Sequence, residues 1–111
     1  MDFEASIDER SDAYSVVAVR GEVDLHTAPK LRYAIERGAE GVPAVVVDLS
    51  GVAFMDSTAL STLMRAKEAA ESVGSSLRLA APSRAIGRIF DVTGFRDYFD
   101  VYPSREAAVS A

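Results

Sequence analysis

Hydrophobic and polar residues alternate at the start of the chain, where Phe3, Ala5 and Ile7 are separated by polar side chains. A period of two is typical of a strand with one buried face. A polar break at residues 9–13 then leads into YSVVAVRG at 14–21, a stretch that favours a strand. We therefore expect an antiparallel hairpin whose first strand lies at the edge of a sheet.

Apolar residues in the range 26–41 fall on one stripe at helical spacing, so this range predicts a helix. Pro29 suits its first turn, where the missing N–H costs nothing. We expect Gly38 and Gly41 to end the helix.

The run AVVVDL at 44–49 is apolar on both faces, which is typical of a central strand covered by helices on each side. We expect a loop at 51–55 to lead from this strand into a second helix. Helical and strand patterns then alternate to the end of the chain. The elements expected there are a helix at 57–73, a strand at 77–81, a helix from 82 to 93, a strand at 98–102 and a helix from 104.

This order of elements predicts an α/β fold with a mixed sheet, formed by an N-terminal antiparallel hairpin and then parallel strands, with about four helices. Residues 1–111 are expected to form a single domain, because the chain is too short for two.

The composition excludes several classes of function. The net charge is −5 and the basic residues are scattered, which disfavours nucleic-acid binding. The chain has no cysteine, its first residues are acidic, and no apolar run approaches the ~20 residues that cross a bilayer. We expect a cytoplasmic protein that makes no membrane contact.

The segment with the most chemistry is Asp56-Ser57-Thr58, at the expected start of the second helix. Such residues commonly cap helices, so a cap without further function is one explanation of the pattern. The alternative is that a hydroxyl here is a phosphorylation site, because a phosphoryl group at a helix start meets unpaired N–H groups and the positive end of the dipole.

Three blocks of the chain resemble the anti-sigma-factor antagonists of the STAS domain family. They are GEVD at 21–24, VVVDLSGVAFMDSTAL at 45–60 and RIFDVTGF at 88–95. The resemblance implies that Ser57 is phosphorylated by an anti-sigma factor that is also a serine kinase. It also implies that the unphosphorylated form binds this partner and frees a sigma factor, and that a serine phosphatase restores binding.

The resemblance extends to the neighbours of Ser57. Asp24 matches an acidic position near the phosphorylation site, and Asp56 and Thr58 match the residues that flank the serine, so all of them are expected at the partner interface. Ala59 and Ser61 stand where the family usually has glycines. We expect the Ala59 methyl to limit how closely a partner's backbone approaches Ser57.

Other functions have less support. Glu22, Asp24, Asp48 and Asp56 are all expected near strand ends, as in a magnesium-dependent receiver, but no lysine follows the last strands. Hydrolase and nucleotide-loop motifs are absent from the sequence, so we expect no catalysis, no cofactor and no metal. The remaining alternative is a STAS domain that only scaffolds other proteins, without reversible phosphorylation.

Overall fold

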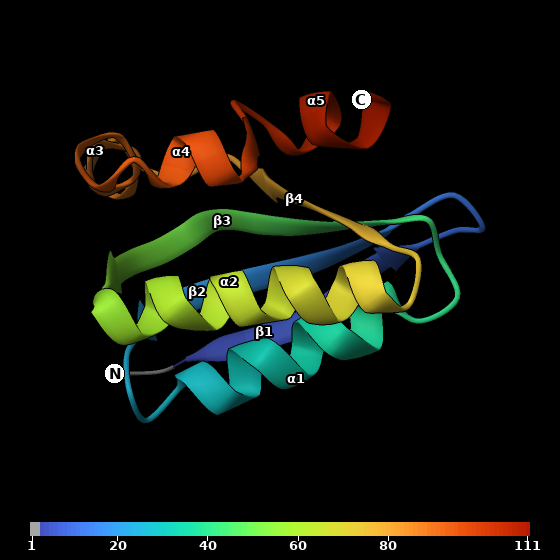
Figure 1. Cartoon of the computed structure of the whole chain (residues 1–111), viewed down its shortest axis with the longest axis horizontal. Coiled ribbons are helices and arrows are strands. Elements are labelled where there is room, and N and C mark those ends of the chain that lie inside the picture. Colours follow the sequence, from blue (N-terminus) through green and yellow to red (C-terminus); the bar gives the residue numbers. More distant parts are fainter. Residues whose placement is uncertain (1–2) are drawn as a thin grey trace.

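The computed structural model describes residues 3–111, which form a five-stranded sheet in the order β1-β2-β3-β4-β5 with helices packed against it (Figure 1). The strands are β1 (Glu4–Arg10), β2 (Ser15–Val23), β3 (Ala44–Met55), β4 (Ser76–Ala80) and β5 (Asp100–Tyr102). The helices are α1 (Ala28–Ala39), α2 (Ser57–Ser72), α3 (Arg84–Thr93), α4 (Phe95–Tyr98) and α5 (Arg105–Ser110).

The sheet is mixed, as the sequence predicts. The edge strand β1 pairs antiparallel with β2, and each later neighbour pairs in parallel. Because successive parallel strands are added in one direction, right-handed crossovers place α1, α2 and α3 on one face. Their apolar residues share one core with this face of the sheet, and α1 and α2 lie side by side in Figure 1.

The opposite face of the sheet is less covered than expected. A second, small cluster there joins Val16, Val46 and Ala80 to Ala108 of α5. The middle of β3 is therefore buried on both faces, as predicted, but α5 is the helix that covers the second face, and the rest of that face is open. No helix within residues 3–111 combines the length and the apolar character of a membrane span.

β3 is longer than the sequence indicates. The expected loop at 51–55 is wrong, because pairing with β2 continues from Arg20 and Gly51 to Val23 and Met55, through two register shifts. A side chain at Gly51 would bring its Cβ within 2.7 Å of the Arg20 Cβ, so glycine allows this close pairing. The residue after Met55 consequently leaves a hydrogen-bonded strand and not a loop.

The role expected for Gly38 is also wrong. Gly38 lies inside α1, where a Cβ would come within 2.7 Å of Val17 Cγ2, so the missing side chain lets the helix pack closely on β2. Gly41, with φ +76°, follows the C-cap Glu40 and supports the predicted end of the helix.

The C-terminal third contains one helix that the sequence does not predict. The left-handed Gly94 ends α3 as predicted, but the next four residues form α4, so the last strand is shorter than the expected 98–102. Phe95 joins α4 to the core, with ring centroids 5.0 Å from Phe90 and 4.3 Å from Phe99.

Candidate functional site

The candidate site lies where β3 passes into α2. Asp56 is the N-cap of α2, and its Oδ1 accepts a hydrogen bond of 3.0 Å from the Ala59 N–H. The Asp56 N–H donates to the Val23 carbonyl of β2 at 3.3 Å. The start of the helix is thus held from both sides, by its own cap and by the neighbouring strand.

Ser57 is the first residue of α2, and its side chain is exposed. Its hydroxyl makes no hydrogen bond with any other residue in the range 3–111, and the same holds for the half-buried Thr58. Helix geometry leaves the N–H groups of the first turn without intrahelical partners, and Asp56 satisfies that of Ala59. The N–H groups of Ser57 and Thr58 therefore remain available at the positive end of the helix.

From the sequence, each of Asp56, Ser57 and Thr58 could have been a helix cap. The structure assigns this role to Asp56. Asp56 alone provides the side-chain cap of α2, so neither Ser57 nor Thr58 is needed for capping. An exposed hydroxyl without a structural bond is the group that an incoming enzyme or partner can reach.

The effect expected for the Ala59 methyl is wrong. Ala59 is fully buried in the main core, so its side chain points away from the surface where a partner would approach Ser57. Ser61, the other departure from the family's glycines, is exposed one turn later. Alanine at position 59 favours the helix without narrowing access to the site.

Asp24 lies beside Asp56, because Val23 and Met55 are paired in parallel and each aspartate follows its strand. Its Oδ1 accepts hydrogen bonds from the N–H groups of Thr27 at 3.1 Å and His26 at 2.9 Å. The bond from Thr27, helped by that from His26, lowers the pKa of Asp24 below its ordinary value. Asp24 therefore stays charged and closes the turn into α1.

The four acidic residues that the sequence placed near strand ends do not gather at one site. Asp48 lies within β3, not at its end, and its Oδ2 accepts from Arg105 Nε at 3.0 Å. Glu22, half-buried, lies one residue before Val23 on β2. Within residues 3–111 no group of three or more His, Asp or Glu side chains is arranged to hold a metal ion.

Two exposed apolar residues next to the site were missed from the sequence. Leu25, directly after Asp24, is 68% exposed, and Phe54, near the end of β3, is 48% exposed. Along the chain both lie within two residues of a site aspartate, Leu25 directly after Asp24 and Phe54 two residues before Asp56. Phe54 was missed because the sequence predicts a loop at 51–55, whereas β3 continues to Met55.

Comparisons with known proteins place the chain among relatives of the same length and fold. A model of the STAS domain matches residues 4–108. The chain is 34% identical over 96 residues to the anti-sigma-B factor antagonist of Staphylococcus epidermidis, with 86% of this chain and 89% of that protein covered. Identity to the anti-sigma-B factor antagonist of Bacillus subtilis (strain 168) is 33% over 93 residues, covering 84% and 85% of the two chains. A crystal structure of an anti-sigma factor antagonist from Mycobacterium paratuberculosis matches with a TM-score of 0.82 at 32% identity, covering 98% of this chain and 92% of that one.

Proposed function

Because the chain belongs to the STAS domain family, we propose that it is an anti-sigma-factor antagonist, whose unphosphorylated form binds an anti-sigma factor and so releases a sigma factor. The descriptions of its relatives at 33% and 34% identity support this assignment. In this proposal the chain is a cytoplasmic binding protein and not an enzyme, and the partner contributes the serine kinase activity.

One observation carries the regulatory part of the proposal: the exposed Ser57 hydroxyl at the start of α2, which has no hydrogen-bond partner within the described chain. A kinase reaches this oxygen without unfolding the helix, because Asp56 holds the cap. A serine phosphatase reaches the product in the same way and returns the protein to its binding form.

Phosphorylation at this position leaves the fold in place. The phosphoryl group carries close to two negative charges, and it meets the open first-turn N–H groups and the positive end of the helix dipole. Its repulsion from Asp56 is the same with and without a partner, so that repulsion does not regulate binding.

The regulation therefore comes from the partner's surface. Packing a protein on the start of α2 removes water from the dianion or sets it against acidic groups, at a cost of ~3 kcal/mol, equivalent to about a hundredfold in affinity. Asp24, Asp56 and Thr58 line the same edge as Ser57, and we assign them to the interface. The exposed Leu25 and Phe54 add apolar area to it.

The experiment that tests the proposal is purification of the tagged chain from its own cells, followed by mass spectrometry of the bound proteins and of the phosphorylated residues. We expect an anti-sigma factor with a kinase domain in the complex and phosphate on Ser57. Ser57→Ala should abolish the label, whereas the control Ser61→Ala, at an exposed hydroxyl one turn later, should keep it. Label on Thr58 or Ser61 in place of Ser57 would mean that the proposal names the wrong hydroxyl as the switch.

A further inference from the structure

A groove runs between the edge strand β1 and the helix α1, which lie next to each other (Figure 1). It holds two adjacent hollows, with volumes of about 460 Å³ and about 230 Å³. Both hollows are lined by Ala5 of β1 and by Tyr33 and Ala34 of α1, so they form one continuous groove. Phe3 lines the first hollow and Ile7 the second. The groove therefore follows β1, and its walls are mainly apolar.

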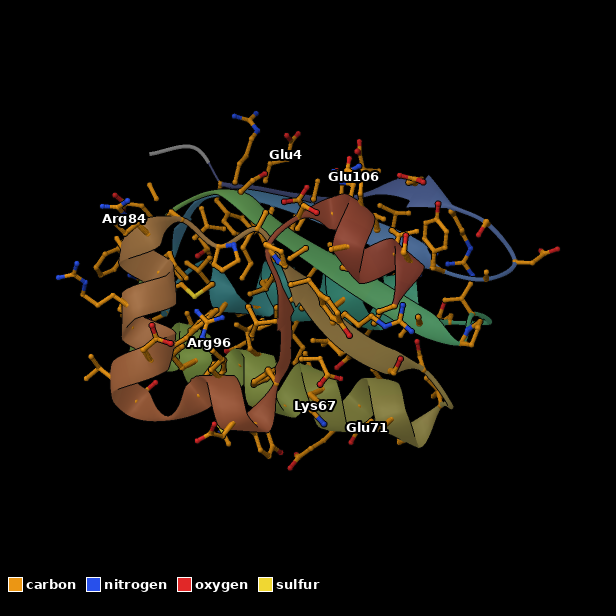
Figure 2. The ribbon with its side chains drawn as sticks, turned by 90° about the horizontal axis from the view of Figure 1, so that it is seen from above. Glu4, Lys67, Glu71, Arg84, Arg96 and Glu106 are labelled. Atoms are coloured by element: carbon orange, nitrogen blue, oxygen red, sulfur yellow. The ribbon has the colours of Figure 1, made fainter. Side chains whose placement is uncertain are left out.

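The side of β1 that borders this groove has no neighbouring strand among residues 3–111. β1 pairs only with β2, and Figure 2 shows Glu4 at the outer edge of the sheet. In an antiparallel strand every second residue points its N–H and C=O away from the paired strand, so β1 presents open backbone groups along the groove. The pairing is regular from Glu4 to Ile7 and shifts register before Glu9. The stretch from Glu4 to Ile7 is thus extended and open to a further strand.

Two large side chains leave the groove apolar and accessible. Ile7 is 41% exposed and Tyr33 is 63% exposed, so the described chain covers neither of them. Arg37 holds the Tyr33 ring in place, because its Nη1 donates to the Tyr33 hydroxyl at 2.9 Å and its Cζ lies 5.8 Å from the ring centroid. Beyond the register shift, Arg10 Nη1 donates to the Gly38 carbonyl at 3.3 Å and ties β1 to the last turn of α1. The walls of the groove are therefore fixed by contacts within the chain.

The charges around the groove favour an acidic partner segment over a second copy of this chain. Lys30 lines the first hollow, is exposed and forms no ion pair among the described residues. The acidic side chains of β1 are already paired, Glu4 with Arg20 at 2.8 Å and Asp8 with Arg105 at 2.8 Å. A second copy paired through β1 would add its own Glu4 and Asp8 beside these pairs, and like charges on neighbouring strands are unfavourable. Lys30 instead offers a positive charge to an acidic side chain of another protein.

We infer that this groove binds an extended segment of a partner protein, which joins the sheet as a further strand antiparallel to β1. Main-chain hydrogen bonds to the open edge provide affinity, and side chains in the hollows provide specificity. Residues on one face of a strand are two positions apart, so the segment carries apolar residues at i and i+2. An acidic residue at i+4 then lies at the end of the groove where Lys30 is found. The inference rests on β1 and α1 and is independent of phosphorylation at Ser57.

The test is a titration of the full chain with two synthetic peptides of equal composition, followed by amide NMR spectra and hydrogen exchange. The first peptide, acetyl-STVTVTDG-amide, has the inferred pattern, whereas the valines of the second, acetyl-STVVTTDG-amide, lie on opposite faces of a strand. We expect the first to bind saturably, with shifts centred on residues 3–9 and 29–37. The second should bind at least about tenfold more weakly, because only one valine enters a hollow. The amides of β1 that point away from β2 should exchange more slowly in the complex.

Tyr33→Ala removes the wall that the two hollows share and should weaken binding of the first peptide about tenfold. The matched control is Tyr98→Ala, at an exposed tyrosine of α4, which should leave binding unchanged. The inference is overturned if the two peptides bind alike, if both variants weaken binding equally, or if the β1 amides keep their exchange rates in the complex. Dimerisation of the free chain through residues 4–7 would assign the groove to a second copy and would overturn it as well.

Discussion

Asp48 lies inside β3 and Asp56 directly follows that strand, but the surroundings of the two aspartates differ. Asp48 is 7% exposed, and its oxygens accept hydrogen bonds from the Ser50 N–H at 2.9 Å and from Arg105 of α5. Arg105 also pairs with Asp8 and Glu9 of β1. Asp56 is half-buried, caps α2 and has no cationic partner within residues 3–111.

The difference separates a structural network from a site built for an outside molecule. The Asp48 network links β1, β3 and α5, and groups of the chain itself satisfy its charges. At the start of α2, the chain leaves an acidic edge and a free hydroxyl next to exposed apolar side chains. Changes in the first region should affect stability, and changes in the second should affect partner binding.

The largest effect is expected from Ser57→Asp, which places a permanent charge where a partner packs. Affinity for the anti-sigma factor should fall at least about tenfold, toward the hundredfold expected for the phosphoryl dianion, because aspartate carries one charge and the phosphoryl group close to two. The protein should remain folded. Isothermal titration calorimetry measures the change. Ser72→Asp, at the exposed far end of α2, is the control and should bind as the unchanged chain does. If both variants lose the same affinity, the start of α2 has no special role in partner binding.

Asp48→Asn should have the next largest effect, on stability. The variant leaves Arg105 without its most buried partner, and the free energy of unfolding should fall by ~2 kcal/mol. Urea unfolding provides the measurement. Glu106→Gln, a neighbouring exposed residue labelled in Figure 2, should change stability by less than ~0.5 kcal/mol. If Asp48→Asn is as stable as the unchanged chain but binds the partner weakly, Asp48 belongs to the partner interface and not to a structural network.

The cap of α2 gives a smaller effect. Asp56→Ala removes the side-chain acceptor of the Ala59 N–H and should cost ~1 kcal/mol of stability. Thr58→Ala should cost less than ~0.5 kcal/mol, because the Thr58 hydroxyl makes no bond within the described chain. Thermal unfolding of both variants tests the assignment, which fails if Thr58→Ala is the more destabilising.

The pH dependence of stability gives the smallest signal. The lowered pKa of Asp24 contributes equally in the unchanged chain and in Asp48→Asn, so the difference between the two proteins reports the lowered pKa of Asp48. Burial alone would raise this pKa, but the Ser50 N–H and then Arg105 outweigh it, so the pKa lies below its usual range. A carboxyl with a lowered pKa stabilises the fold above its unfolded pKa. That stability is lost as the pH falls from about 5 through the folded pKa. Unfolding curves at several pH values should show a smaller loss on acidification for Asp48→Asn than for the unchanged chain.

The sequence predicted the elements whose pattern is local. The alternation at β1, the doubly buried run in β3 and the cap residues before α2 all report short-range periodicity or hydrogen bonding. The exposed Ser57 followed from its place at a helix start.

The missed features depend on contacts between distant residues. Asp48 and Arg105 are 57 positions apart, so no local pattern links them. The extension of β3 depends on its pairing with β2 across two register shifts, and the role of Gly38 depends on Val17 of that strand. The inward direction of Ala59 likewise follows from how α2 packs, which the motif alone does not fix.

Incubation of the complex with ATP tests the central claim most directly. The affinity of the anti-sigma factor is measured before and after ATP, for the unchanged chain and for Ser57→Ala. We predict that ATP weakens binding of the unchanged chain about a hundredfold and leaves that of Ser57→Ala as it was. If ATP weakens both equally, or weakens neither, the Ser57 hydroxyl is not the switch.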